Sequence, residues 1–316
     1  MRQVSPKLKV WLDDFNIKVQ QLIEGGFKPT STNARDGLAN LTKALVTDIP
    51  NVDWIQDDLV SGEEFDVPVR IYHPAPEKAL PVLIYYHGGG GMAGSVTVYD
   101  PICRKFALAT QHIVVSVDYR LAPECPFPAG VKDGYAVVQN IWAVLQQREV
   151  RYIERLSIAG DSGGGALAAS VSAKAQFDDK VSIHQQVLIY PSLDYTMDTP
   201  SMDENAEGYL LQKGKIAWYF DNYFQDGEDR RAESPLYQPI ASNLPETLIF
   251  TAEFCPLRDE GKLYCEKLAD AGVKAKLVHF DDMIHAFLNM EDLVSDACLR
   301  VYQATGQFLN HQESNV

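Results

Sequence analysis

The chain has 316 residues, with 28 Lys or Arg against 43 Asp or Glu, and therefore carries a net charge of −15 at neutral pH. Its 46% hydrophobic and 22% charged residues are typical of a folded protein and exclude a disordered chain. Nucleic acids and anionic membrane surfaces are bound through clusters of Lys and Arg, which this sequence lacks. We therefore expect no nucleic-acid partner and no membrane partner.

The first residues and the cysteines indicate a cytoplasmic protein. Charged residues such as Lys9 and Asp13 interrupt the apolar positions of residues 1–19, so this segment does not resemble a secretory signal. Nowhere do about 18 apolar residues run together, as a membrane-spanning helix would require. The five cysteines are odd in number and lack the short paired spacing of a metal site. We expect reduced thiols and no bound metal.

Residues 1–50 predict one or two amphipathic helices. Apolar side chains recur there at helical spacing, at Leu8, Trp11, Leu12, Phe15 and Val19. After them, residues 52–60 and 67–74 are strand-like and flank the turn-like segment 61–66. This pattern predicts an antiparallel hairpin.

From residue 81 onward, strand and helix patterns alternate. The strand-like runs are apolar, β-branched or aromatic, and they lie at 81–87, 112–119, 155–160, 185–191, 247–254 and 275–280. Helix patterns are found at 101–109, 131–145, 165–177, 259–271 and 293–309. Runs without strict alternation fit strands that are buried on both faces of a parallel sheet. The sequence predicts an α/β fold with a mostly parallel sheet and helices on both faces.

One connection in this α/β pattern is too long for a simple turn. Residues 195–238 include the segment YLLQKGKIAWYFDNYF, which predicts a helix with an aromatic face. Long excursions that return to the sheet are often lids over an active site. We expect a catalytic core formed by 51–194 and 239–316, with residues 1–50 and 195–238 forming a helical cap.

A candidate nucleophile follows the strand-like run at 155–160. Gly160-Asp161-Ser162-Gly163-Gly164 matches the pattern G-x-S-x-G, and a helix pattern follows it. In this strand–turn–helix context the serine sits on a sharp, strained turn, and its neighbours must be small for strand and helix to approach. Ser162 also precedes a helix, whose N-terminus favours developing negative charge. We expect Ser162 to be the nucleophile.

A run of glycines, Gly88 to Gly91, follows the strand-like run at 81–87. Such a run lets bare backbone N–H groups face a tetrahedral oxyanion without interference from side chains. An HGGG loop of this type is the usual partner of the serine turn. We expect the N–H groups of Gly89, Gly90 and Gly163 to form the oxyanion hole, and His87 to brace the loop.

The general base should follow the nucleophile in the chain. His285 lies just past the last strand-like run, in the segment MIHAF. His184 and His279 fall inside strand patterns, and His311 lies in a polar tail. We therefore expect His285 to be the base.

Taken together, these motifs resemble the hormone-sensitive-lipase family of α/β-hydrolases. The matching segments are HGGG at 87–90, DYRLAPE at 118–124, GDSGG at 160–164, LIYPSLD at 188–194, CPLRDEG at 255–261 and MIHAF at 283–287. The resemblance implies an α/β-hydrolase fold whose cap comprises the N-terminal segment and residues near 195–238, where Glu204 and Asn205 also match. It implies hydrolysis of short- to medium-chain carboxylic esters without a cofactor, and it is compatible with a homodimer formed through an edge strand.

The sequence departs from this family at the position of the triad acid. Members have aspartate where this chain has Cys255. Four explanations stand at this point: Cys255 acts as a thiolate; another carboxylate, such as Asp282, Asp194, Glu253 or Asp259, reaches His285; the enzyme works as a weakened Ser–His dyad; or the cysteine is an introduced substitution. Losing the acid of such a triad costs roughly 10⁴-fold in kcat.

The sequence therefore predicts a serine carboxylesterase that acts on a small-molecule ester. Two alternatives remain open at this stage. An amidase or deacetylase would use the same machinery, because both reactions pass through a tetrahedral oxyanion. A small-molecule binding protein on a disabled hydrolase scaffold would explain the missing acid.

Overall fold

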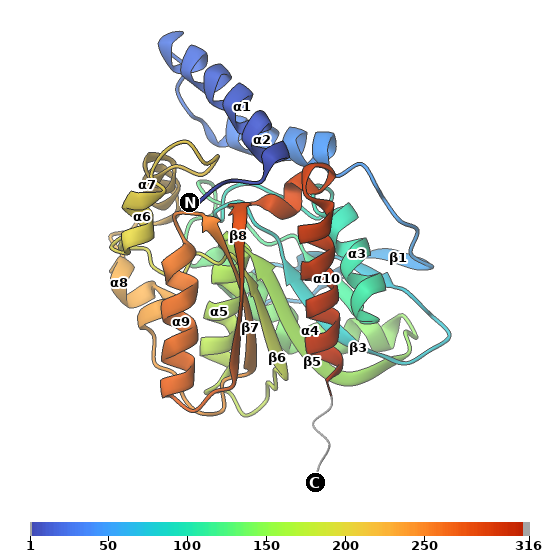
Figure 1. Ribbon diagram of the computed structural model, residues 1–316. Coiled ribbons are helices and arrows are strands. Elements are labelled where there is room, and N and C mark those ends of the chain that lie inside the picture. Colours follow the sequence, from blue (N-terminus) through green and yellow to red (C-terminus); the bar gives the residue numbers. More distant parts are fainter. Residues whose placement is uncertain (1, 312–316) are drawn as a thin grey trace.

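The computed structural model describes residues 2–311, and its centre is one eight-stranded sheet (Figure 1). The strands are ordered β1-β2-β4-β3-β5-β6-β7-β8. Their bounds are Trp54–Val60 (β1), Val67–His73 (β2), Leu80–Tyr86 (β3), Ile113–Val117 (β4), Tyr152–Asp161 (β5), Gln185–Ile189 (β6), Glu246–Phe254 (β7) and Ala275–Ile284 (β8). The pairs β1–β2 and β2–β4 are antiparallel, and the strands from β4 to β8 pair in parallel. Both the predicted hairpin and the mostly parallel sheet are confirmed.

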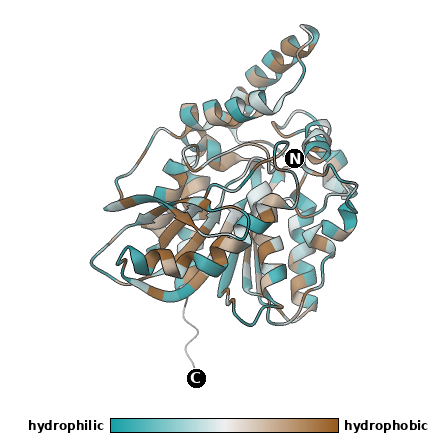
Figure 2. Cartoon of the chain, turned by 180° about the vertical axis from the view of Figure 1, so that it is seen from behind, coloured by the Kyte–Doolittle hydropathy of each residue, from teal (hydrophilic) through white to brown (hydrophobic). Residues whose placement is uncertain are grey.

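Burial explains why the central strands lack alternation. All five residues of β4 and all five of β6 are buried, because helices cover both faces of the sheet. The helices α3 (Asp100–Thr110) and α10 (Ser295–Asn310) pack on one face, while α4 (Ala129–Gln147), α5 (Gly163–Ala175) and α9 (Arg258–Asp270) pack on the other. In Figure 2, hydrophobic residues concentrate on the strands and on the inner sides of these helices. The predicted helices are confirmed, with their ends shifted by a few residues.

Two further groups of helices lie outside the layers of the α/β core, and parts of both lie above the carboxyl ends of the parallel strands (Figure 1). The first group is α1 (Pro6–Glu24) and α2 (Ser31–Leu45), as residues 1–50 predict. The second lies within 195–238 and comprises α6 (Pro200–Glu204), α7 (Lys213–Tyr223), α8 (Arg230–Glu233) and the short 3₁₀ helix η1 (Pro235–Tyr237). A further 3₁₀ helix, η2 (Phe287–Leu293), precedes α10. Helices α1, α2 and α7 lie over the edge of the sheet where the motif residues lie, whereas η1 packs against α5 and α9 beside the sheet.

Helix α1 attaches to the body only through its first turns. Leu8 and Leu12 are buried, whereas Val10, Ile17 and Leu22 are exposed, and the far end of the helix projects away from the sheet (Figure 1). Within residues 2–311, no helix combines the length and the apolar character needed to cross a bilayer.

Candidate active site

The motif residues meet at one edge of the sheet, because each follows a parallel strand. The glycine run follows β3, Ser162 follows β5, Cys255 follows β7 and His285 follows β8. The carboxyl ends of neighbouring parallel strands lie at the same edge of the sheet, where α/β proteins place their binding sites. Chain segments far apart in sequence are therefore brought together by strand order.

Ser162 sits on a strained turn between β5 and α5. Its φ of 53° and ψ of −120° lie in a region that non-glycine residues rarely adopt. The turn is held by the Ser162 N–H, which donates to the carbonyl of Ile189 at 2.9 Å. A Cβ on Gly164 would lie 2.1 Å from the carbonyl oxygen of Tyr86, so α5 can approach β3 only because this residue is glycine. This turn holds the Ser162 hydroxyl beyond the carboxyl end of β5.

The glycine loop packs directly against this turn. Gly89 and Gly90 have φ values of 122° and 64°, which favour glycine, and a Cβ on Gly163 would lie 2.8 Å from both the amide nitrogen and the Cα of Gly90. Among the described residues, the N–H groups of Gly89, Gly90 and Gly163 have no acceptor, although all three residues line the same cavity as Ser162. Three free donors thus lie beside the serine hydroxyl.

His285 lies between Ser162 and Cys255. Its Nε2 is 2.8 Å from Ser162 Oγ, and its Nδ1 is 3.1 Å from Cys255 Sγ. The edge of the imidazole packs against Tyr190, with ring centroids 4.9 Å apart. Burial, with a further contribution from the Lys215 charge, lowers the pKa of His285 to about 3. The imidazole is therefore neutral at physiological pH.

The other histidines lie elsewhere. His279 contacts Thr251 and Glu253 from within β8, and His184 precedes β6. His311 is exposed at the end of the described chain. His87 stacks on Tyr119 at 4.4 Å between ring centroids, and its Nδ1 lies 2.9 Å from the carbonyl oxygen of Gly88. These contacts match the loop-bracing position expected of His87.

Cys255 occupies a closed environment. Its side chain is fully buried, and the Leu257 N–H donates to Sγ at 3.3 Å. Burial raises the pKa of the Cys255 thiol far above its usual value, so the group next to Nδ1 is a neutral thiol. This argues against the thiolate explanation, because the charge of Arg258 offsets only a small part of the cost of burying a thiolate.

None of the four candidate carboxylates contacts His285 in the described structure. Asp282 is exposed on β8, and Asp194 accepts hydrogen bonds from Thr196 and Tyr237. Glu253 and Asp259 are both paired with Arg258. Cys255 is thus the only partner of Nδ1 within residues 2–311.

Asn205 braces the loop that carries Cys255. Its side-chain amide donates to the carbonyl oxygens of Glu253 at 3.1 Å and Cys255 at 3.0 Å. Its neighbour Glu204 pairs with Arg258 at 2.8 Å. The residues that match the family pattern in this segment therefore position the turn after β7.

Asp161 holds the glycine loop. Its carboxylate accepts hydrogen bonds from the Gly88 N–H at 2.8 Å and from the hydroxyls of Tyr85 and Tyr99, each at 3.0 Å. Burial raises the pKa of Asp161 to about 6. With its oxygens occupied in this way, Asp161 contributes to the position of the loop.

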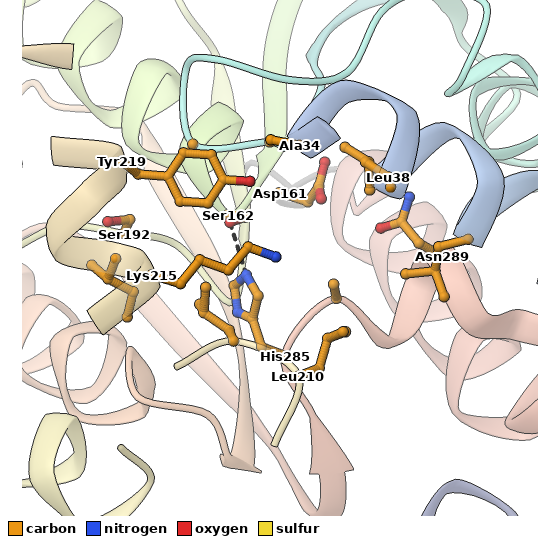
Figure 3. Close-up of a pocket in the computed structure, with 18 of the residues that line it drawn as sticks. Ala34, Leu38, Asp161, Ser162, Ser192, Leu210, Lys215, Tyr219, His285 and Asn289 are labelled. Atoms are coloured by element: carbon orange, nitrogen blue, oxygen red, sulfur yellow. Dashed lines mark hydrogen bonds between the residues drawn. The ribbon is translucent and has the colours of Figure 1, made fainter. Parts of the chain in front are cut away.

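A cavity of about 210 Å³ opens above Ser162 (Figure 3). Apart from the motif residues, Tyr99 and Asn289, its lining comes from α1, α2, α7 and the segment before α7, and includes Phe15, Leu38, Leu41, Leu210, Leu211, Lys215, Ile216, Tyr219 and Phe220. The sequence motifs indicate none of these residues. The one signal available is helical spacing, since Lys215 and Tyr219 are four residues apart and share one side of α7. Within residues 2–311, no group of three His, Cys, Asp or Glu side chains is arranged to hold a metal ion.

Comparison with known proteins assigns the chain to a family. A family model for the alpha/beta hydrolase fold matches residues 83–289. Carboxylesterase NlhH of Mycobacterium tuberculosis is 38% identical over 97% of this chain and 94% of its own length. Carboxylic ester hydrolase LipN of the same organism is 36% identical over 76% of this chain, but only 65% of its own length is covered.

A solved structure shares the arrangement over nearly the whole chain. The hyperthermophilic esterase from the archaeon Pyrobaculum calidifontis superposes with a TM-score of 0.86 at 33% identity, covering 97% of this chain and 98% of that one. The family match, the relatives and the fold all lead to the same assignment. The chain belongs to the α/β-hydrolases, in the hormone-sensitive-lipase-like branch of carboxylic ester hydrolases.

Proposed function

We propose that this protein is a serine carboxylesterase. The observation that carries the proposal is the 2.8 Å contact between Ser162 Oγ and His285 Nε2, in a cavity that also exposes three free backbone N–H groups. Ser162 attacks the ester carbonyl while His285 takes its proton, and the N–H groups of Gly89, Gly90 and Gly163 stabilise the oxyanion. His285 then protonates the departing alcohol. Water cleaves the acyl-enzyme in the same way, with His285 again acting as base.

The Nδ1 side of His285 limits this cycle. For Nε2 to accept the serine proton, the imidazole must carry its own proton on Nδ1. The Nδ1–H group then donates a hydrogen bond to Cys255 Sγ. A neutral thiol is a weak acceptor, and it gives no charge stabilisation to the imidazolium that forms during attack. We infer that the protein works as a weakened Ser–His dyad with Cys255 in the acid position.

The proposal is tested by covalent labelling together with turnover. A fluorophosphonate should modify the protein once, and peptide mass spectrometry should locate the adduct on Ser162. 4-Nitrophenyl acetate and butyrate should be hydrolysed by the same preparation, and labelling should lower that turnover at least to the rate of the Ser162→Ala variant. The Ser162→Ala variant should remain unlabelled. Turnover that stays above the Ser162→Ala rate after complete labelling, or labelling at another serine, would overturn the assignment.

Replacing Gly163 with alanine should lower kcat by about 10²- to 10³-fold, the usual cost of losing an oxyanion donor. The new Cβ would lie 2.8 Å from the Gly90 backbone, so the glycine loop has to move away from Ser162. Steady-state kinetics on 4-nitrophenyl acetate measures the loss. Gly214→Ala in α7, where a Cβ meets nothing within 4 Å, is the matched control and should retain full activity. Equal activity of the two variants would show that the Gly163 N–H group does not stabilise the oxyanion.

The pH profile should reflect the low pKa of His285. The base works only when neutral, so kcat/KM falls as the pH drops through that pKa, which lies at about 3. The profile of the native chain should therefore stay flat from pH 8 down to pH 5. In a Cys255→Asp variant the carboxylate stabilises the imidazolium and raises the pKa of His285, which moves the acidic limb to higher pH. A native limb near the ordinary histidine value, unchanged by the substitution, would contradict this account.

Three further features belong to the same proposal. We infer that residues 1–50 and 195–238 act as the cap, since both segments line the cavity above Ser162. A cytoplasmic location is supported by the five cysteines, all of which are free. A homodimer formed through β8, at the free edge of the sheet, stays a prediction that a solution mass measurement tests.

A further inference from the structure

The cavity above Ser162 contains a cation that the ester mechanism does not use. Lys215 extends from α7 into the cavity, and its amino group points toward the cavity centre beside His285 (Figure 3). The remaining lining contributed by the helices and their flanking segments is mainly apolar, as the leucines and aromatic residues named above show. A neutral ester chain would have no use for a charge at this position.

Lys215 has no counter-ion among the described residues. No carboxylate of residues 2–311 lies within ion-pairing distance of its Nζ, and the Tyr219 ring, whose centroid is 5.9 Å away, gives it a cation–π contact. Asp161, the carboxylate of the cavity, is engaged by Gly88, Tyr85 and Tyr99. Lys213, which lies just before Lys215 on the same helix, shows the usual alternative, because it pairs with Asp203 at 2.5 Å.

The position of Lys215 is unfavourable on local grounds. It lies in the first turn of α7, where the helix dipole disfavours a positive charge. The surrounding protein lowers the pKa of Lys215, so the charge is also partly deprived of water. Residues that break local rules in this way tend to mark functional sites.

We infer that Lys215 receives a carboxylate of the substrate, so that the preferred esters of this enzyme are anionic. The inference rests on the proposed esterase function and names its substrate class. Because the chain has a net charge of −15, it repels anions in general. An anionic ester therefore needs a cation inside the cavity in order to bind. Lys215 lines the cavity together with Ser162 and His285, so a carboxylate bound to its amino group would lie beside the reacting ester.

The bound carboxylate also affects the chemistry. The charge of Lys215 opposes protonation of His285, and Cys255 supplies no negative charge to compensate. A substrate carboxylate paired with Lys215 offsets that charge at the moment when the imidazolium forms. The preference for anions should therefore appear in kcat as well as in KM.

Two matched pairs of substrates test the inference. The first pair is 4-acetoxybenzoate and 4-acetoxybenzamide, which carry the charge on the alcohol half. The second is the 4-nitrophenyl monoester of adipic acid and the 4-nitrophenyl ester of adipamic acid, which carry it on the acyl half. Each rate is divided by the rate of alkaline hydrolysis of the same ester, which removes differences in leaving group. The pairs thus establish which half of the ester carries the anion.

For at least one pair, the native chain should prefer the anion by about tenfold or more in kcat/KM at low salt, the size expected of a charge-assisted contact. Lys215→Met should abolish the preference, Lys215→Arg should retain it, and added salt should reduce it. Lys213→Met removes an equal charge from the same turn outside the cavity and should leave the preference intact. No preference for the anion in either pair, or a preference that survives in Lys215→Met, would overturn the inference.

A binding measurement separates this result from the fate of the esterase proposal. Calorimetric titration compares 4-hydroxybenzoate and adipate with 4-hydroxybenzamide and adipamide on the native chain and on Lys215→Met. Stronger binding of an anion that is lost with Lys215 supports the anion site even if no ester is turned over. Equal binding of acid and amide, together with Ser162-dependent hydrolysis of 4-nitrophenyl acetate, would leave the esterase intact and refute the role of Lys215.

Discussion

Replacing Cys255 with aspartate is expected to raise kcat on 4-nitrophenyl acetate by about 10²- to 10⁴-fold, because it restores the charge that a serine triad places beside Nδ1. The thiol is neutral where it lies, 3.1 Å from Nδ1, since burial keeps its pKa high. A carboxylate there can accept from both His285 Nδ1–H and the Leu257 N–H that now donates to Sγ. It fixes the tautomer in which Nε2 accepts the serine proton.

Cys255→Asn separates charge from shape. The amide has nearly the size of aspartate and offers an oxygen acceptor, but it adds no negative charge, so its kcat should stay far below that of Cys255→Asp. Thermal unfolding of both variants establishes that they fold, because each places a polar group in a closed site. If Cys255→Asp and Cys255→Asn both match the native rate, the charge at this position is irrelevant and the dyad interpretation fails.

The cost of removing Ser162 should depend on which residue occupies position 255. In a serine protease with a complete Ser–His–Asp triad, losing the serine lowers kcat by about 2 × 10⁶-fold, whereas losing the acid alone lowers it by about 3 × 10⁴-fold. The ratio of these two losses is roughly 10². In an enzyme that already lacks the acid, removing the serine should therefore lower kcat by only about 10²-fold. We expect Ser162→Ala to lower kcat by about 10² in the native chain and by about 10⁴ to 10⁶ in the Cys255→Asp background.

The four combinations of residues at 162 and 255 form a cycle that measures this coupling. In the Ser162→Ala background, Cys255→Asp should have almost no effect on kcat, because an acid without a nucleophile has nothing to assist. Labelling with a fluorophosphonate gives the concentration of active sites for each chain that retains Ser162. Equal losses on the two backgrounds would show that Ser162 and position 255 act independently, and would exclude a Ser–His–Cys arrangement.

The fold was largely predictable, because its signals are local. Runs such as 112–119 and 185–191 are short, β-branched or aromatic, and apolar without alternation, which is the pattern of a strand covered on both faces. The structure places β4 and β6 within them. The helix ends were less predictable: α5 begins at Gly163 and not at residue 165, because the strained Ser162 directly precedes its first turn. Side-chain periodicity does not report such a turn.

The identity of the partner of His285 was not predictable from the residues alone. Cys255 and several carboxylates are all compatible with the sequence, and Asp282 adds an acid only three residues before His285. In the structure Asp282 is exposed on β8, while Cys255, carried by the turn after β7, lies next to the imidazole. Neighbouring strands align these residues, and that alignment depends on the register of the sheet.

The sequence by itself determined the nucleophile turn, the glycine loop and the α/β sheet, because the types of neighbouring residues decide the local backbone conformation and which strands can be buried. Gly160, Gly163 and Gly164 lack the bulk that would block a sharp turn between a strand and a helix, and this turn brings Ser162 to the end of the strand. Tertiary structure alone decided what surrounds that serine. Phe15, Leu38 and Lys215 come from helices with no motif of their own, and they line one cavity only because α1, α2 and α7 pack over the same edge of the sheet. Substrate choice depends on that packing, since it decides which side chains, charged or apolar, face the reacting ester.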